Sequence, residues 1–245
     1  MNQYSYSPQF YSYINGGALR SAQRFAALLL AEIPVNSVLD IGCGQGAWLR
    51  AWADAGIDDI VGIDGPYVDP EALLIDRGHF VGHDLSKDIS LDRHFDLATS
   101  IEVAEHLPAS ASGTIVDLLT SHADIVLFSA AVPGQGGENH INEQPLEYWQ
   151  KLFADRGFSA YDFFRPRLKH DKNIERWYRF NAILYANEAG QQRLTEAVKA
   201  TRVPSGTKPA FYGDLIWRLR IGLGRLLPVH LSTSLAVFKS RLIHS

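Results

Sequence analysis

The stretch VLDIGCGQG, residues 38–46, constrains the fold more than any other part of this chain of 245 residues. A short apolar run is followed by glycines at positions 42, 44 and 46. Because glycine has no Cβ, the chain can take positive φ there and a ligand can lie against the main chain. In a doubly wound α/β sheet, ligands bind where the loop after the first strand leads into a helix. We therefore expect a strand, a ligand-binding loop and a helix in that order.

Asp40 sets this loop apart from a dinucleotide-binding loop. The dinucleotide fingerprint is G-x-G-x-x-G, whereas the third glycine here comes one residue earlier. Asp40 stands two residues before Gly42, where its charge would repel a phosphate group. A carboxylate at this position suits a cation, such as the amino group of an amino-acid ligand.

Strand and helix patterns alternate along the first 190 residues, as in a parallel sheet with crossover helices. The last two apolar runs are separated by a polar loop without a helix, which predicts antiparallel pairing. The expected fold is α/β, a Rossmann-like seven-stranded, mostly parallel sheet with one antiparallel edge strand and helices on both faces. Helices are expected at 20–33, 47–57, 111–121 and 146–158, and strands at 37–42, 59–65, 79–86, 95–107 (running into a helix), 123–133, 161–168 and 177–186.

Composition and charge narrow the setting and the partners. Apolar residues make up 46% of the chain and Cys43 is the single cysteine, so a disulfide framework and a cysteine metal site are excluded. We find no signal-peptide pattern and no run as long as a membrane span, and we expect a cytoplasmic protein. Residues 201–245 hold seven Lys and Arg against one acid, although the whole chain has a net charge of -4. The acidic body argues against a nucleic-acid partner.

With Asp40 and the glycines in this strand context, the chain resembles the class I S-adenosylmethionine-dependent methyltransferases of types 11 and 23 over residues 20–187. The resemblance implies that the loop holds the methionine end of the cofactor and that Asp40 orients it. Asp64 is placed to accept from the ribose hydroxyls, or is a turn acid before Gly65. Asp84 resembles the residue that accepts from the adenine amine, or is a turn residue. The expected cofactor-binding residues are Asp40, Gly42, Gly44, Gly46, Asp64, Asp84, Leu85 (behind the adenine ring) and Ser100.

The motif EVAEH, residues 102–106, follows the fourth expected strand. On a helix, Glu102, Glu105 and His106 would share one face beside the cofactor pocket, and this donor set suits a divalent cation. The motif is similar to the E-x-x-E-H of two metal-using branches, the ubiquinone-pathway O-methyltransferases and the small-RNA 3′-end 2′-O-methyltransferases. This resemblance implies a further ligand, for which His140 is the candidate, and Mg²⁺, Mn²⁺ or Zn²⁺ as the cation.

Two interpretations of the same residues do not involve a metal. His106 or His140 would serve as the general base, so the catalytic candidates are Glu102, His106 and His140. Alternatively, Glu102 caps a helix, Glu105 is solvated and His106 is hydrogen-bonded near the cofactor. The loop GQGGENHINEQ, residues 134–144, is too rich in glycine and polar residues for a core, which predicts a mobile substrate loop.

Three parts are expected along the chain: an N-terminal lid or arm at 1–20, the cofactor-binding methyltransferase domain at 21–190 and a helical basic extension at 191–245. Tyr11 and Tyr13 precede Asn15-Gly16-Gly17, a flexible stretch suited to a lid. Tyr11, Trp177 and Tyr178 are candidate pocket aromatics, with a pocket role favoured for Tyr11 and a core position favoured for Tyr178. The segment LIWRLRIGLGRLLPVHL of the extension alternates arginines with aliphatic residues. Self-association in a homodimer, or packing on the body, is favoured over membrane contact or a disordered end.

The expected function is methyl transfer from S-adenosylmethionine to a hydroxyl of a small molecule or sugar. Transfer to oxygen is an in-line displacement that needs an activated nucleophile, and a cation or a base supplies the activation. An N-methyltransferase needs less help from a base. That activity, small-RNA 2′-O-methylation and a non-catalytic cofactor-binding role are the alternatives.

Overall fold

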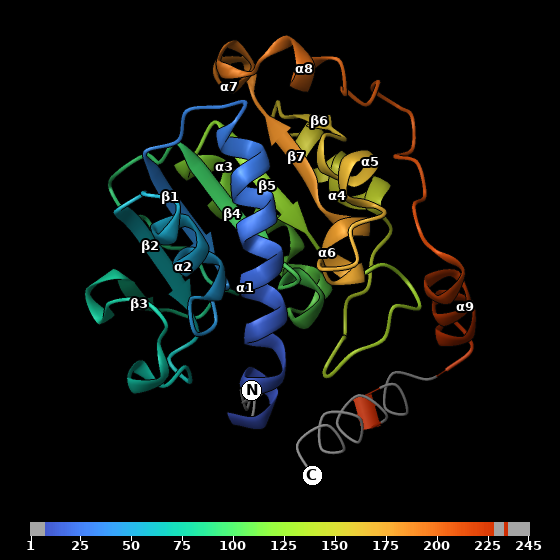
Figure 1. The fold of residues 1–245 in the computed structure, drawn as a ribbon, viewed down its shortest axis with the longest axis horizontal. Helices are drawn as coiled ribbons and strands as arrows, with labels where there is room; N and C mark the ends of the chain where they lie inside the picture. The colour runs from blue at the N-terminus through green and yellow to red at the C-terminus, as the bar shows by residue number, and fades with distance from the viewer. Residues whose placement is uncertain (1–7, 228–232, 235–245) are drawn as a thin grey trace.

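A seven-stranded sheet organises the computed structural model, which describes residues 8–227 and 233–234 (Figure 1). The strands are β1 Ser37–Ile41, β2 Asp59–Asp64, β3 Phe80–Gly82, β4 Leu97–Ile101, β5 Ile125–Ser129, β6 Ser159–Tyr161 and β7 Ile183–Ala186. The α-helices are α1 Pro8–Leu30, α2 Ala47–Asp54, α3 Ser112–His122, α4 Leu146–Ala154, α5 Phe164–Leu168, α6 Arg176–Asn181, α7 Glu188–Arg193, α8 Glu196–Lys199 and α9 Leu215–Gly224.

The strand order is β3-β2-β1-β4-β5-β7-β6. Neighbouring strands from β3 to β5 are parallel, whereas β7 runs antiparallel to both β5 and β6. Antiparallel pairing is thus confined to one edge of the sheet, and the expected fold class is confirmed. The chain order reverses between β1 and β4, which is where open α/β sheets bind their ligands.

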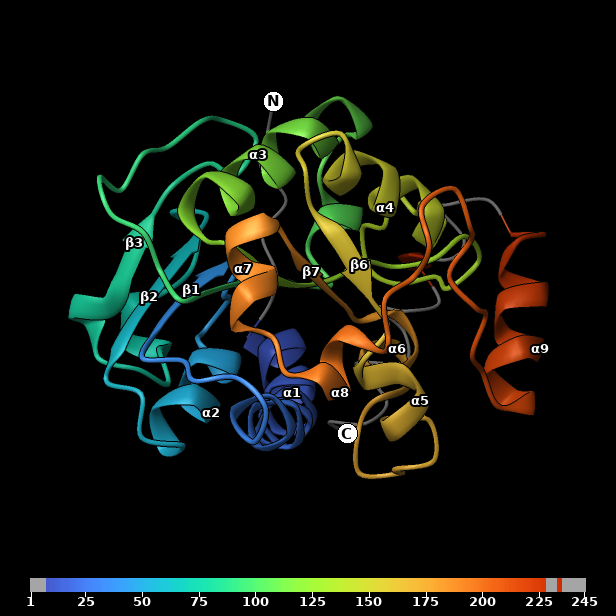
Figure 2. The same cartoon turned by 90° about the horizontal axis from the view of Figure 1, so that it is seen from above.

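Helices cover both faces of the sheet, and each face has its own apolar core (Figure 2). On one face, α1 and α2 pack with α5 and α6 around residues such as Phe25, Trp52 and Phe164. On the other face, α3 and α4 pack around Phe128, Trp149 and Phe153. A strand that is buried on both faces has a nearly continuous run of apolar residues in its sequence. Such runs predicted the positions of β1, β4 and β5.

The expected pair of strands at 161–168 and 177–186, joined by a loop, is wrong in detail. β6 ends at Tyr161 and β7 begins at Ile183, and the helices α5 and α6 lie between them. Phe164 and Leu168 are four residues apart and both buried, which is helical spacing. Arg165 is also buried, because Asp162 accepts from its Nε and Nη2 at 2.8 Å each. The aromatic residues of this segment therefore pack as helix faces.

The helix expected at 20–33 begins twelve residues earlier, so α1 crosses the expected boundary of the N-terminal arm. Asn15, Gly16 and Gly17 lie inside this helix instead of forming a flexible stretch. Gly17 allows close packing, because a Cβ there would lie 2.7 Å from an oxygen of Glu175. The side chains of Tyr11 and Tyr13 lie outside the described part of the chain.

The extension beyond β7 packs in part on the body. Leu194 and Val198 join the core of the α1 face, and Trp217 of α9 is fully buried. No helix in residues 8–227 combines the length and apolar character that crossing a membrane requires. The expectations for residues 228–232 and 235–245 lie outside the described residues.

Candidate functional site

The glycine loop after β1 has the backbone that its sequence predicts. Gly42, Gly44 and Gly46 have φ values of 83°, 54° and 85°, in the left-handed region that favours glycine. Gly46 is the N-cap of α2. A Cβ on Gly42 would lie 2.3 Å from Cγ2 of Val103. The loop therefore packs directly against the EVAEH segment, which brings the expected cofactor loop and the expected metal motif together.

Asp40 is buried at the end of β1, beside that loop. The Thr99 hydroxyl donates to its Oδ1 at 2.6 Å. Burial raises the pKa of Asp40 to about 7; the Thr99 hydrogen bond opposes this rise and the charge of Asp64 adds to it. A buried carboxyl without a cationic partner favours a ligand that brings a positive charge.

Asp64 ends β2 and accepts three hydrogen bonds. The amides of Gly44 and Gly65 donate to it at 2.6 Å each, and the Tyr67 hydroxyl donates at 2.8 Å. Burial nevertheless raises its pKa above the ordinary value. The contact with Gly44 joins the first two strand ends through the acid that we expect to hold the ribose.

The remaining expected cofactor residues lie in different surroundings. Asp84 follows β3 and accepts from the amide and hydroxyl of Ser86, which lower its pKa. This is the turn geometry given above as the alternative, and it leaves the adenine role a prediction. Leu85 is buried. Ser100 of β4 is also buried, and its hydroxyl has no hydrogen-bond partner among the described residues.

The EVAEH segment is not the helix that the spacing predicts. β4 ends at Ile101, Glu102 has a φ of 56°, and only Ala104–His106 form a short 3-10 turn. The three side chains therefore do not share one helix face. The Gln135 amide donates to Oε2 of Glu102 at 2.6 Å and the Asn181 amide donates to Oε1 at 3.2 Å. Glu102 thus ties β4 to the loop after β5 and to α6.

Glu105 carries the strongest chemical signal of the site. Its side chain is fully buried, and neither carboxyl oxygen has a hydrogen-bond partner among the described residues. Burial, together with the charge of Glu102, raises the pKa of Glu105 well above its usual range. The alternative expectation that Glu105 is exposed to solvent is therefore wrong. An unpaired buried carboxyl is costly unless a proton or a cation neutralises it.

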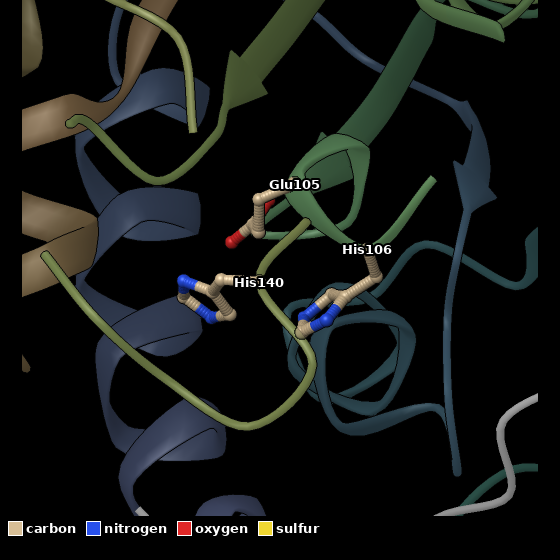
Figure 3. A group of neighbouring side chains, drawn as sticks. All are labelled: Glu105, His106 and His140. Carbon is tan, nitrogen blue, oxygen red and sulfur yellow. The ribbon is translucent and has the colours of Figure 1, made fainter. Parts of the chain in front are cut away.

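Glu105, His106 and His140 form a group whose ligand atoms all lie within 4.8 Å of one another. Figure 3 shows the three side chains around one space, two from the segment after β4 and His140 from the loop after β5. The imidazole rings are 4.9 Å apart at 84°. Three of the four residues expected to bind a metal are therefore assembled, and Glu102 lies outside this group.

The two histidines are oriented by different partners. Nδ1 of His106 lies 3.3 Å from the carbonyl oxygen of Asn139. Burial lowers the pKa of His106 to about 3, with a further contribution from His140. Nδ1 of His140 lies 3.0 Å from Oε1 of Glu143, so Nε2 is the nitrogen that remains to meet a cation. In metal sites, a carboxylate commonly accepts a hydrogen bond from the second nitrogen of a metal-binding imidazole and fixes the orientation of the ring.

The loop at 134–144, expected to be mobile, is held in place by its own acid. The amides of Gly134 and Gly136 each donate to Glu143 at 2.7 Å. Burial alone would raise the pKa of Glu143, but these bonds and His140 outweigh it and lower the pKa. The amides of Ile141 and Asn142 donate to the carbonyl oxygen of Glu105 at 2.9 and 3.0 Å. The loop is thereby attached to the EVAEH segment.

Sequence reasoning missed four side chains of the site: Tyr67, Gln135, Glu143 and Asn181. Gln135 and Glu143 lie within the loop whose composition indicated a functional role, but their contacts depend on how the loop folds. Asn181 comes from α6, in a segment that was expected to be a strand. No sequence signal pairs it with Glu102.

The donor set of the three-residue group fits a divalent cation. A buried carboxylate and two imidazoles are ligands that Zn²⁺, Mn²⁺ and related ions accept. Neutral imidazole is the ligating form, and the low pKa of His106 keeps it neutral. The raised pKa of Glu105 favours its protonated form, so Glu105 would release a proton when a cation binds and would then balance part of the cation's charge.

Comparisons with known proteins agree with this geometry. Residues 15–127 match the family model described as a methyltransferase domain. No curated protein matches the sequence. Magnesium protoporphyrin IX methyltransferase from Synechocystis PCC 6803 is 21% identical with a TM-score of 0.51, covering 70% of this chain and 80% of that one.

Two further solved structures have the same fold. CalS10, an amino pentose methyltransferase from Micromonospora echinaspora, is 16% identical with a TM-score of 0.52, covering 76% of this chain and 99% of that one. The methyltransferase domain of bacterial CtHen1-C is 18% identical with a TM-score of 0.50, covering 69% of this chain and 97% of that one.

Proposed function

We propose that this chain is a class I S-adenosylmethionine-dependent methyltransferase that methylates a hydroxyl oxygen of a small molecule or sugar. The match of residues 15–127 to a methyltransferase domain and the similarity in fold support the first part of this proposal. We further propose that a divalent cation held by Glu105, His106 and His140 takes part. The observation that carries this proposal is the buried, unpaired carboxyl of Glu105 beside two imidazoles. An acceptor nitrogen with a lone pair would have less use for such a group.

The residues at the ends of β1, β2 and β3 would bind the methyl donor. Asp40 and the bare backbone of Gly42 and Gly44 suit the ammonium and carboxylate of the methionine end. We expect Asp64 to accept hydrogen bonds from the ribose hydroxyls when the cofactor binds. In this structure it accepts such a bond from the Tyr67 hydroxyl at 2.8 Å. Asp84 and Leu85 remain the candidates for the adenine side.

The acceptor half accounts for activation of the nucleophile. A bound divalent cation lowers the pKa of a hydroxyl that it contacts and fixes its direction. Glu143 holds the imidazole of His140, and Glu102 holds the loop through Gln135. These contacts keep the group assembled next to the cofactor loop, where an in-line transfer needs its nucleophile.

The surroundings of the two histidines favour different roles for them in this proposal. With a pKa of about 3, His106 is a weak base and fits a ligand role better. His140, paired with Glu143 at 3.0 Å, is the better candidate if the acceptor is deprotonated without a metal. That metal-free mechanism is the alternative for the same reaction.

Support for a sugar or small molecule comes from charge and from one structural relative. The chain has a net charge of -4, which opposes binding of an RNA backbone. CalS10 is described as an amino pentose methyltransferase. An activated sugar or glycosylated small molecule is therefore the first class of acceptor to screen.

Calorimetric titration tests the cation and the cofactor separately. S-adenosylhomocysteine should bind the wild type and Glu105→Gln alike, because Glu105 is absent from the expected cofactor set. Mn²⁺ and Zn²⁺ should bind the wild type, and Glu105→Gln or His140→Ala should weaken that binding at least about a hundredfold, because losing a ligand costs more than the tenfold to hundredfold typical of losing a residue that orients one. Glu71→Gln and His94→Ala, which alter exposed residues, are the matched controls and should leave metal affinity unchanged.

An acceptor screen then follows S-adenosylhomocysteine release with and without EDTA. Turnover that survives both EDTA and Glu105→Gln would remove the cation from the mechanism. Turnover that also survives His106→Ala and His140→Ala would favour an N-methyltransferase. Failure of S-adenosylhomocysteine to bind at all would contradict the methyltransferase assignment itself.

A further inference from the structure

Helix α9 has two apolar faces, and only one of them packs on the described part of the protein. Trp217 and Ile221 point inward and are buried with Val132 and Phe180. The opposite face and the turn after it are solvent-exposed, with exposed fractions from 41% for Leu227 to 79% for Leu226. The exposed aliphatic residues are Leu215, Ile216, Leu219, Leu223, Leu226 and Leu227. Their spacing of one, three or four residues gathers them on one side of the helix.

All charged side chains from Leu215 to Leu227 are arginines, namely Arg218, Arg220 and Arg225. All three are exposed. Arg218 and Arg225 donate to the main-chain oxygens of Gly213 and Pro133, and neither forms an ion pair with a described carboxylate. Since the chain as a whole has a net charge of -4, this helix carries positive charge on an acidic protein.

We propose that α9 docks the protein onto an anionic lipid surface. Its outward aliphatic face would enter the boundary between headgroups and acyl chains, with the arginines at the level of the lipid phosphates. An anionic surface attracts the arginines and repels the acidic body. The two effects together select one orientation, in which the helix lies on the membrane plane.

A second copy of the chain is the less suitable occupant of this face. A helix of ten residues is only about 15 Å long, so its outer face offers far less than the roughly 800 Å² per partner of a stable interface. Two copies of α9 packed face to face would also bring their arginines together without acids between them. A lipid surface requires neither a matching shape nor a matching area.

The docking face lies close to the proposed active site. Arg220 donates to the main-chain oxygens of Gln135 and Gly136 at 2.7 and 2.8 Å. A Cβ on Gly224 would lie 2.0 Å from the carbonyl oxygen of Gly134. Figure 1 shows α9 beside the loop that follows β5. Membrane docking would therefore hold the acceptor loop near the lipid headgroups.

Vesicle flotation of the full-length protein tests this proposal. The wild type should float with vesicles that contain phosphatidylglycerol, bind pure phosphatidylcholine at least about tenfold more weakly, and dissociate as ionic strength rises. Leu219→Gln combined with Leu223→Gln should reduce binding about tenfold or more, whereas Leu219→Met with Leu223→Met should retain it. Arg218→Gln with Arg225→Gln should weaken binding, and the control pair Arg50→Gln with Arg77→Gln should not.

Three results would overturn the proposal. One is a wild type that binds neither kind of vesicle at low ionic strength. Another is unchanged flotation of the Leu219→Gln, Leu223→Gln variant, which would assign membrane binding to another part of the chain. The third is a wild-type dimer in light scattering that this variant converts to a monomer, which would assign the face to a second copy. Circular dichroism of the variant, expected to match the wild type, checks its folding, and titration with S-adenosylhomocysteine keeps this result separate from the proposed methyl transfer.

Discussion

Buried carboxyl groups along one edge of the sheet dominate the chemistry of this protein. Asp40, Asp64 and Glu105 are each at most 5% exposed, and burial raises the pKa of all three. None has a described basic side chain as an ion-pair partner. In their ionised forms these acids would stabilise positively charged ligands, such as the ammonium and sulfonium groups of S-adenosylmethionine and the divalent cation that we propose.

The pKa of Asp40 predicts a pH dependence for cofactor binding. With a folded pKa of about 7, Asp40 is mostly protonated at pH 6 and mostly ionised at pH 8. If the ionised form holds the ligand's ammonium group, affinity for S-adenosylhomocysteine should rise about tenfold between these pH values. Calorimetry across this pH range with Asp40→Asn should give a weaker and nearly flat profile. Asp58→Asn, an exposed change before β2, is the control.

The raised pKa of Asp40 also makes the stability of the unliganded protein depend on pH, with the opposite sign to the cofactor affinity. Because the folded pKa lies above the unfolded value of 3.8, the folded state binds more protons between these two values, and its stability falls as pH rises from about 4 to 7. Asp40→Asn should remove this part of the pH dependence in denaturant titrations. An affinity for S-adenosylhomocysteine that is constant from pH 6 to 8 would contradict the role given to Asp40.

The sequence predicted the part of the site that depends on residue type. It could not predict the part that depends on how the backbone folds. The three glycines have the positive φ values that the sequence indicated, and Asp40 lies at the end of β1 beside their loop, because these features depend on the local strand and loop. Glu102 could not be placed, since its φ of 56° turns the chain where a helix was expected. Glu143 could not be paired with His140 in advance, because their contact requires the whole loop to fold.

At the scale of elements, the sequence correctly predicted the strands that are continuous apolar runs and the helices that are followed by a glycine. β1, β2, β4, β5 and the helices α2 and α4 lie within the expected ranges, and α3 ends one residue beyond its range, at His122. The segment between β6 and β7 was assigned wrongly because aromatic residues favour strands in general. There, the ion pair between Asp162 and the buried Arg165 and the core positions of Phe164 and Leu168 stabilise a helix instead. Packing of Phe164 against Phe25, far away in the sequence, overrides the local preference.

Close packing of α9 on the acceptor loop predicts different effects for its two glycines. A Cβ on Gly224 would clash with the main-chain oxygen of Gly134, whereas nothing lies within 4 Å of a Cβ on Gly222. Gly224→Ala should therefore loosen α9 by about 1–3 kcal/mol. Gly222→Ala should stabilise the helix by about 0.5–1 kcal/mol. The rate of tryptic cleavage after Arg218, Arg220 and Arg225 measures this local stability.

The two glycine variants serve as controls for each other, since both add one methyl group to the same helix. Faster cleavage is expected for Gly224→Ala and slower cleavage for Gly222→Ala. Because Arg220 holds the loop that carries His140, Gly224→Ala should also weaken metal binding. Equal cleavage rates for the two variants would mean that α9 does not depend on its contact with Gly134.

At the scale of the whole molecule, one sheet links two separate cores to one functional edge. Phe25 packs against Trp48 and Phe164 on one face. Phe153 stacks on Tyr185 at 3.9 Å on the other face. The strands β1, β4 and β5 contribute side chains to both cores and carry the site residues at their ends. Neither core can therefore be lost while the site stays intact.

This arrangement predicts a single cooperative unfolding transition that ligand binding shifts as a whole. Phe25→Ala and Phe153→Ala should each destabilise the protein by about 3–5 kcal/mol, which lowers the melting temperature by at least about 6 °C. Far-UV circular dichroism and tryptophan fluorescence should follow the same curve in both variants. S-adenosylhomocysteine at about 100 times its Kd should restore about 2.7 kcal/mol to each. If the two probes separate, or if the ligand stabilises only one variant, the two faces unfold independently and the site depends on one of them alone.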